Sequence, residues 1–192
     1  MYVPPLFKAP EKETLTRLMQ TANFGLLISR GGADGLVATH LPFAYDAGRG
    51  EFGTLIAHMA RSNPHADILE EDEALVVFLG PHHYISPNYY VTDGNVPTWN
   101  YVAAHAYGTP VILRDDAAVR AVLERQTAEQ ERAMPTPWNP EGLDPARYQA
   151  LLRGVTVFEI EIQRIDAKAK LGQNKSPADQ ASMTTAIGRL WD

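Results

Sequence analysis

Cysteine is absent from the 192 residues of the chain, and this absence excludes several kinds of site. Disulfide bonds, thiolate metal sites, iron–sulfur clusters and a cysteine nucleophile all require this residue. Long apolar runs are also missing, because no stretch approaches the roughly 18 residues that a membrane-spanning helix needs. Residues 1–13 lack the charged-then-apolar order of a signal peptide. We therefore expect a cytoplasmic protein with no membrane contact.

Positive charge is scarce. The chain has 17 Lys and Arg against 23 Asp and Glu, which gives a formal net charge of −6. Non-specific nucleic-acid binding depends on neutralising phosphates with Lys and Arg. The composition therefore disfavours direct nucleic-acid binding, although a local basic patch would still permit it.

Short motifs of several enzyme classes are missing as well. There is no G-x-S-x-G elbow and no Walker loop, so neither a serine hydrolase nor a P-loop nucleotide site is predicted. No H-E-x-x-H pair is present, and the histidines that could be metal ligands come from different segments. These are His40, His58, His82, His83 and His105. We expect no metal site, and we assign no catalytic residue.

What the sequence does contain is a series of short periodic segments, punctuated by 14 glycines and 14 prolines. Because no repeat or long linker interrupts them, residues 1–192 are predicted to form one domain. Apolar residues at helical spacing predict a helix after Pro10, with Gly25 as the left-handed residue beyond its end. The other expected helices are two in a helical insertion around 115–153 (115–133 and 145–154) and a C-terminal helix around 177–191.

The helical insertion is the one place where a helix–turn–helix could lie. Asp115 or Asp116 can cap its first helix, and Gly154 can end its second. One face of the first helix carries Val119, Val122, Leu123 and Gln126. The insertion has seven acidic residues and five arginines, and a net charge of −2 is not typical of a DNA-recognition surface.

Strand-like segments fill much of the remaining chain. A hairpin is predicted from strands at 25–30 and 36–45 with a turn at 31–35. Further strands are expected at 51–60, 73–80, 105–114 and 154–165. The nearly continuous apolar run at 73–80 predicts a central strand. In 154–165, Phe158, Ile160 and Ile162 alternate with polar residues, which predicts one buried face. Short antiparallel strands with helices clustered late favour an α+β barrel.

Five segments at strand ends are rich in Pro, Asn, His and aromatic residues, where binding groups often concentrate. They are 38–43, 57–64, 80–87, 96–101 and 170–176. In 57–64, Arg61 and Asn63 precede Pro64 at an expected helix start, which is a competent anion site. The alternative is that Asn63 only caps this helix and Arg61 is solvated.

Segment 96–101 places an aromatic ring next to an amide. Trp99 could form a wall for a planar heteroaromatic ligand, and Asn100 could recognise the edge of that ligand. The alternative is a core tryptophan beside a turn asparagine.

Seven motifs, in this order along the chain, resemble the PaiB-type family of FMN-binding negative transcriptional regulators. They are MYVPPLF, ATHLPF, HMARSNP, VVFLGPHHYISP, VPTWNY, HAYG and KLGQNKS. The resemblance implies a split β-barrel of mainly antiparallel strands with flanking helices. It also implies a dimer that holds FMN, or a site shaped for it, at the subunit interface. A half-open barrel leaves edges and apolar faces that a second copy would cover, so we expect a homodimer.

The resemblance further implies roles for particular residues. Arg61 and Asn63 become candidate ligands of the FMN phosphate. Thr39, His40 and Pro42 become candidates to line the flavin ring or the ribityl chain. The other pocket candidates, some of them supplied by a partner subunit, are His58, Trp99, Asn100, Lys170, Gln173 and Asn174.

Some positions depart from the family pattern. Gly172 stands where the family usually has serine, which removes a hydroxyl donor. Asn88 and Tyr89 stand where serine and tryptophan are common, and His83 replaces a smaller residue. These departures affect the last motif and the YISP segment, and they leave the segment with Arg61 intact.

Three functions stay open at this stage. The first is a flavin-dependent redox protein or sensor, in which the isoalloxazine carries the chemistry and any regulatory role is indirect. The second is a transcriptional regulator that contacts DNA directly, as the family name implies. The third is a haem-binding or haem-processing protein on the same barrel, with one of His40, His58, His82 or His105 as axial ligand.

Overall fold

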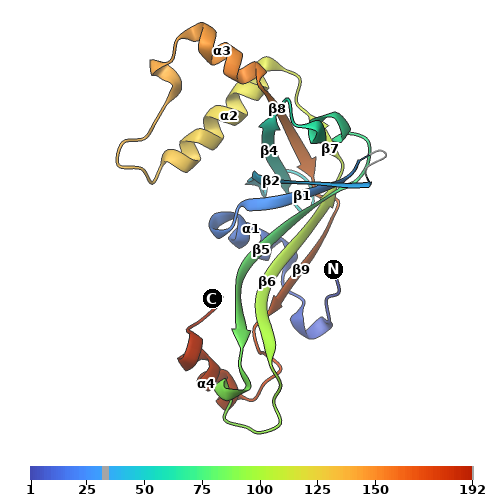
Figure 1. The fold of residues 1–192 in the computed structure, drawn as a ribbon, viewed down its shortest axis with the longest axis vertical. Coiled ribbons are helices and arrows are strands. Elements are labelled where there is room, and N and C mark those ends of the chain that lie inside the picture. Colours follow the sequence, from blue (N-terminus) through green and yellow to red (C-terminus); the bar gives the residue numbers. More distant parts are fainter. Residues whose placement is uncertain (32–34, 192) are drawn as a thin grey trace.

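The computed structural model of the protein describes residues 1–31 and 35–191, and it contains two antiparallel β-sheets (Figure 1). The five-stranded sheet has the order β2-β1-β5-β6-β9. Its strands are β1 (Phe24–Gly31), β2 (Gly35–Pro42), β5 (Ala74–Ile85), β6 (Thr98–Gly108) and β9 (Arg164–Lys170). The four-stranded sheet has the order β3-β4-β8-β7. Its strands are β3 (Ala44–Asp46), β4 (Thr54–Ala60), β7 (Pro110–Ile112) and β8 (Val155–Glu161).

Helices flank the two sheets. The α-helices are α1 (Glu11–Thr21), α2 (Asp116–Glu131), α3 (Pro145–Arg153) and α4 (Pro177–Ile187). The short 3₁₀ helices are η1 (Pro5–Phe7), η3 (Pro64–Ile68), η4 (Pro87–Tyr89) and η5 (Pro140–Gly142). In Figure 1, α2 and α3 project from one end of the molecule, and α4 lies at the far end of an arm formed by β5 and β6. No helix within residues 1–31 and 35–191 is long and apolar enough to cross a membrane.

One hydrophobic core lies between the sheets and α1. Leu15 and Leu18 of α1 are fully buried with Leu27 of β1 and Phe78 of β5. Phe158 of β8 joins them from the other sheet. The predicted alternation in this strand is confirmed, since Phe158 and Ile160 are buried while Glu161 is exposed. The predicted central position of 73–80 is also confirmed, because β5 is the middle strand of its sheet.

Three predicted strands are each divided between the two sheets. The segment 36–45 forms β2 and β3, the segment 105–114 forms β6 and β7, and the segment 154–165 forms β8 and β9. At the second of these crossings the chain passes very close to β8. A Cβ atom on Gly108 would lie 2.3 Å from the carbonyl oxygen of Glu161. These crossings join the two sheets around one core.

Two predicted helix ends are wrong. Helix α1 ends at Thr21, and Gly25 lies in β1 instead of following the helix as a left-handed residue. A Cβ atom there would lie 2.7 Å from the Phe78 ring, so this glycine permits close packing. Helix α4 ends at Ile187, because Gly188 has a φ of 74° and turns the chain. The predicted turn at 31–35 includes residues 32–34, which lie outside the described residues.

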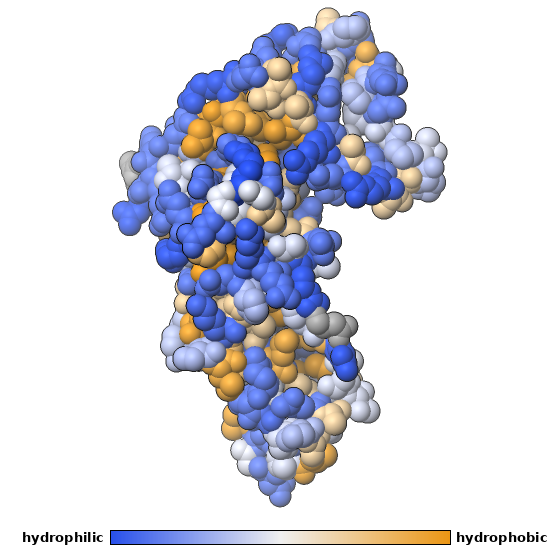
Figure 2. All heavy atoms as spheres, turned by 180° about the vertical axis from the view of Figure 1, so that it is seen from behind, coloured by the Kyte–Doolittle hydropathy of each residue, from blue (hydrophilic) through white to orange (hydrophobic). Residues whose placement is uncertain are grey.

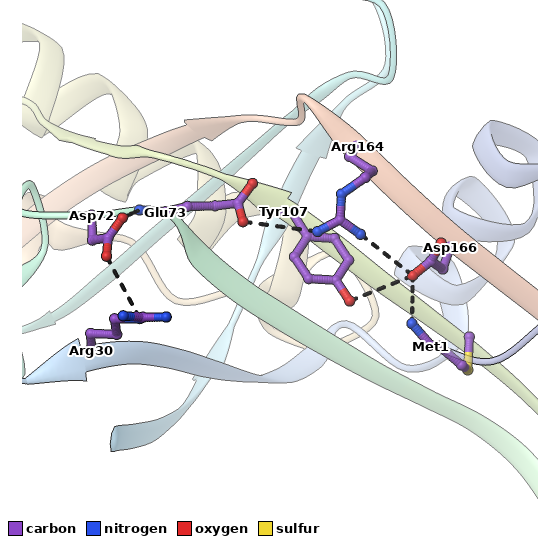
Figure 3. Close-up of polar contacts among 7 residues, drawn as sticks. All are labelled: Met1, Arg30, Asp72, Glu73, Tyr107, Arg164 and Asp166. Atoms are coloured by element: carbon purple, nitrogen blue, oxygen red, sulfur yellow. Dashed lines mark hydrogen bonds and ion pairs between the residues drawn. The ribbon is translucent and has the colours of Figure 1, made fainter. Parts of the chain in front are cut away.

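A polar cluster joins β9 to its neighbours (Figure 3). The Arg164 guanidinium lies 3.5 Å over the Tyr107 ring of the adjacent strand. It also pairs with Asp166 at 3.6 Å and with Glu73 at 3.9 Å. Asp166 in turn accepts a hydrogen bond from the amino group of Met1 at 2.6 Å. These contacts tie the N-terminal segment and the start of β5 to the edge strand β9.

Candidate functional site

The predicted binding residues fall into two groups within the subunit. The barrel group lies on or beside β2 and β4 and consists of Thr39, His40, Pro42, His58, Arg61 and Asn63. The arm group lies at the far ends of β6 and β9 and consists of Trp99, Asn100, Lys170, Gln173 and Asn174.

Strand register gives the separation of the two groups. Thr39 pairs with Leu27, Leu27 pairs with Val76, and Val76 pairs with Ala106 of β6. Trp99 lies seven residues from Ala106 on the same strand. At roughly 3.3 Å per residue this is about 23 Å along β6. One subunit therefore does not bring Thr39 of the barrel group and Trp99 of the arm group together.

Thr39 contacts a buried histidine that the sequence analysis did not consider. Its hydroxyl lies 2.8 Å from Nδ1 of His65, which is fully buried in η3. Burial lowers the pKa of His65 below its ordinary value. Within the described residues, Nε2 of this ring has no hydrogen-bond partner. His65 lines neither of the two cavities described below.

The anion site expected in 57–64 is only partly formed. Asn63 caps η3, because its side chain accepts a hydrogen bond of 3.0 Å from the backbone N–H of His65. The expected helix start at Pro64 is confirmed, but the helix is a five-residue 3₁₀ helix, which is too short to supply a strong dipole. Arg61 is exposed, and its Nη2 donates to the carbonyl of Val155 at 2.9 Å.

Helix α2 fixes the hydrogen bonding of His58. The Gln126 side chain donates from Nε2 to the carbonyl of Ile56 at 3.1 Å. Its Oε1 therefore faces Nδ1 of His58, at 2.9 Å. Because this oxygen only accepts, Nδ1 of His58 must carry a hydrogen. In the neutral ring, Nε2 is left as an acceptor.

His58 and Pro42 are brought together in one small cavity. It has a volume of about 260 Å³ and is lined on one side by residues of the last part of α2, between 126 and 131. Thr39 and His40 are neighbours on β2 and point to opposite faces. His40 stacks on Phe24 with ring centroids 5.9 Å apart. Gln126 was missed as a site residue, and its signal was a polar side chain on the apolar face of the predicted helix.

In the arm group, Trp99 and Asn100 also point to opposite faces. Trp99 is 53% exposed and lies 5.8 Å from the Tyr84 ring and 6.4 Å from the His82 ring. Asn100 is buried, and its Nδ2 donates to Sδ of Met183 on α4 at 3.3 Å. They therefore do not face one ligand together in one subunit. The alternative expectation also fails, because the tryptophan is exposed and the asparagine lies in a strand.

Two further members of the arm group hold the backbone of this region. Lys170 donates to the carbonyl of Trp99 at 2.9 Å and to the hydroxyl of Thr98, and its burial lowers its pKa. Gln173 accepts from the N–H of Leu171 and donates to the carbonyl of Ala169. Asn174 is exposed.

A larger cavity lies between the barrel and the helical insertion. Its volume is about 720 Å³, and Arg61 lines it together with Arg114, Arg120 and Arg153. The last three were missed, because a count of net charge over 115–153 conceals where Arg120 and Arg153 lie, and Arg114 stands just before that range. No group of three or more His, Asp or Glu side chains in residues 1–31 and 35–191 is placed to hold a metal ion.

Two antiparallel sheets closed by strands that pass from one to the other, with helices outside, define a split β-barrel. Solved structures share this fold. The FAD and haem binding protein from Mycobacterium smegmatis matches with a TM-score of 0.65 and 16% identity, over 91% of this chain and 78% of that one. The flavocytochrome Anf3 from Azotobacter vinelandii matches with a TM-score of 0.59 and 13% identity, over 88% and 72%.

Sequence comparison identifies the family. The family model described as "Putative FMN-binding domain" matches residues 1–164. The "Protease synthase and sporulation protein PAI 2" of Bacillus subtilis is 33% identical over 181 residues, which cover 93% of this chain and 85% of that protein. The chain belongs to this family of FMN-binding domains, and FMN is the cofactor that the family implies.

The side chains present fit such a cofactor. FMN carries a phosphate, a polar ribityl chain and a flat aromatic ring system. The arginine-lined cavity offers guanidinium groups to the phosphate. His58 Nε2 can meet a polar group, and the exposed ring of Trp99 can stack on the aromatic system.

Proposed function

We propose that the protein is a flavin-dependent redox protein or sensor that acts as a homodimer, with each FMN held by the barrel group of one subunit and the arm group of the other. The separation of about 23 Å along β6 between Thr39 of the barrel group and Trp99 of the arm group carries this proposal. Each group has only part of what FMN requires. The barrel group has the arginine and the polar ring nitrogens, and the arm group has the exposed tryptophan.

Exposed apolar surface supports the homodimer. Figure 2 shows apolar side chains at the surface along the arm as well as on the barrel. Leu79, Tyr84 and Trp99, all on β5 and β6, are 55%, 43% and 53% exposed. Large apolar side chains gathered on one sheet are typical of an interaction surface. A second copy seated there would cover them and complete the site.

Each residue of the two groups would have its own role in binding FMN. Arg61 donates charge-assisted hydrogen bonds to the phosphate, and Asn63 keeps the turn that presents Arg61. His58 offers an acceptor at Nε2, because Gln126 holds the hydrogen on Nδ1. The Trp99 ring covers one face of the flavin and excludes water from it. FMN itself supplies the electron transfer when it is bound.

Any effect on transcription is indirect in this proposal. The chain has a formal net charge of −6, and α2 and α3 project from the barrel without burying any residue of their own. A partner that reads the redox state of the flavin would link the protein to gene expression. A gel-shift experiment in which the purified protein retards DNA at physiological salt would contradict this part of the proposal.

Absorption spectroscopy tests the cofactor. Protein incubated with FMN and freed of excess ligand should keep bands in the blue and the near ultraviolet, and the released ligand should be FMN. The two structural neighbours named above bind flavin and haem or are flavocytochromes, so the same protein is also incubated with haemin. An intense Soret band that survives gel filtration, without retained flavin, would contradict the flavin function.

A mixed dimer tests the composite site. Arg61→Ala and Trp99→Ala subunits with different affinity tags are co-expressed, and the heterodimer is isolated. If each site uses both subunits, one site of the heterodimer is intact and the other carries both defects. Half of the sites should then bind FMN with wild-type affinity. Two weakened sites and none intact would contradict the composite site, as would a 21.2 kDa monomer in sedimentation equilibrium at micromolar concentration.

A further inference from the structure

The arginine cavity is built by segments that are distant in the sequence. Arg61 follows β4, Arg114 follows β7, Arg120 lies on α2, and Arg153 is the last residue of α3. The pairing of β4 with β8 at Ala60 and Val155 brings Arg61 next to the end of α3, and α2 supplies Arg120. Four of the 12 arginines of an acidic chain therefore line a single cavity.

Most of these guanidinium groups have no carboxylate partner. Arg114 is paired with Glu70 through two hydrogen bonds. Arg61 donates to a backbone carbonyl, and Arg120 lies 5.1 Å from the centre of the Tyr148 ring. In the part of the chain that the structure describes, neither these two nor Arg153 forms an ion pair.

Two carboxylates also line the cavity, Asp67 of η3 and Asp116 at the start of α2. The cavity lining thus has three guanidinium groups without carboxylate partners and two carboxylates, which gives it an excess of positive charge. A phosphate monoester is dianionic near neutral pH, and arginine binds it through paired, charge-assisted hydrogen bonds. The volume of about 720 Å³ lies within the range of small-molecule sites and leaves room for a polyol chain beside the phosphate.

The insertion itself is loosely packed. No residue of α2 or α3 is buried. The Gln126 side chain provides the hydrogen bonds from α2 to β4, at Ile56 and His58. An element with so little buried apolar surface is stabilised weakly, so a ligand that bridges it to the barrel changes its stability strongly.

We propose that Arg120 and Arg153 of the insertion join Arg61 in holding the phosphate of FMN, so that the bound cofactor fastens the insertion onto the barrel. This inference rests on the proposed function for its ligand. It adds that the insertion is part of the cofactor site. The contact of α2 and α3 with the barrel is then tighter when the phosphate is bound. Riboflavin has the same ring system without the phosphate, so it would not fasten the insertion.

The test compares Arg153→Ala with Arg147→Ala. Both arginines are exposed on α3, but Arg147 does not line the cavity. Arg153→Ala should weaken FMN binding by about 10- to 150-fold, the range for losing a hydrogen bond to a charged group. Its riboflavin affinity should be unchanged, and Arg147→Ala should bind both ligands like the wild type. Arg153→Lys should recover part of the FMN affinity.

Hydrogen exchange gives a second readout. FMN should slow amide exchange in α2 and α3 of the wild type, and riboflavin should not. The slowing should be lost in Arg153→Ala and kept in Arg147→Ala. Inorganic pyrophosphate should compete with FMN but not with riboflavin.

The outcomes separate this inference from the proposed function. Wild-type protein that binds neither FMN nor riboflavin contradicts the proposed function and this inference with it. Wild-type protein that binds FMN, with equal affinities for Arg153→Ala and Arg147→Ala, contradicts this inference alone. Protection of α2 and α3 by pyrophosphate but not by FMN would assign the cavity to a different phosphorylated ligand and would also overturn it.

Discussion

The side-chain amide of Gln126 on α2 lies against His58 on β4, with Oε1 2.9 Å from Nδ1 of the ring. The same amide donates to the carbonyl of Ile56. One polar side chain therefore joins the helical insertion to the barrel and sets which nitrogen of His58 carries the hydrogen in the neutral ring.

Replacing Gln126 by Ala should remove the hydrogen bonds of this side chain to His58 and to the carbonyl of Ile56. The free energy of unfolding should fall by about 1 kcal/mol, the typical net value of a hydrogen bond. Nitrogen NMR of the imidazole should show the hydrogen of neutral His58 on Nδ1 in the wild type and shared between both nitrogens in the variant. Gln130→Ala removes a side chain that lines the same cavity and should leave the His58 spectrum unchanged. A single Nδ1–H form in both variants would mean that another group holds the ring.

Replacing Arg61 by Ala should weaken the binding of FMN but not the binding of riboflavin. FMN binding should weaken by about 1.5–3 kcal/mol, the value of a hydrogen bond to a charged group, which is about 10- to 150-fold in Kd. Riboflavin binding should hardly change, because it has no phosphate. Fluorescence titration of both ligands measures this, with Arg125→Ala as the control at an arginine paired with Glu129. Equal losses for both ligands would place the phosphate elsewhere, and no loss for either would leave Arg61 a solvated surface residue.

Two histidines should make the protein less stable in mild acid. Burial lowers the pKa of His65 and of His105 below the ordinary value of 6.5. Between that value and the folded pKa, the unfolded chain binds more protons than the folded protein, so stability falls as pH decreases. Urea unfolding should therefore give a lower free energy at pH 5.5 than at pH 7.5.

The variants His65→Gln and His105→Gln test whether these two histidines cause the loss of stability at low pH. Each should reduce the slope of unfolding free energy against pH, whatever its effect on stability at pH 7.5. An unchanged slope in both variants would show that other groups cause the acid sensitivity.

Gly108→Ala should be strongly destabilising. The added Cβ would lie 2.3 Å from the Glu161 carbonyl oxygen and 2.8 Å from the Ile160 side chain, where the chain passes from β6 to β7. We expect a loss of about 3 kcal/mol, the upper part of the range for overpacked sites. Gly142→Ala is the matched control, because a Cβ there meets nothing within 4 Å. Similar unfolding free energies for the two variants would show that the chain between β6 and β7 can shift to accept the Cβ atom without loss of stability.

Much of the local structure was predictable from the sequence. Asp115 caps α2 and Gly154 follows α3, as their residue types predict. The alternation of Phe158 and Ile160 with polar residues predicts a strand with one buried face, and the structure confirms it. These features depend on short-range hydrogen bonds and on side-chain periodicity, so neighbouring residues suffice to specify them.

Sheet membership was not predictable in this way. The alternating pattern of 154–165 continues past the point at which the chain leaves β8 for β9, because Ile162 is buried at the crossing itself. Periodicity reports that a face is buried, but it does not report which sheet the strand joins. Pairing partners are chosen by contacts between segments far apart in the chain, and no local pattern encodes them.

The composition, the seven motifs and the periodic segments by themselves determined the family, the α+β barrel and the residues that are candidates for FMN binding. Only the tertiary structure decided how these candidates are grouped. Strand register set Thr39 and Trp99 about 23 Å apart along the sheet direction. The pairing of β4 with β8, which sets Ala60 opposite Val155, brought Arg153 to Arg61 across 92 positions of sequence. Net charge and spacing describe a chain along one dimension, whereas a binding site depends on which side chains share a volume, and that is fixed by long-range packing.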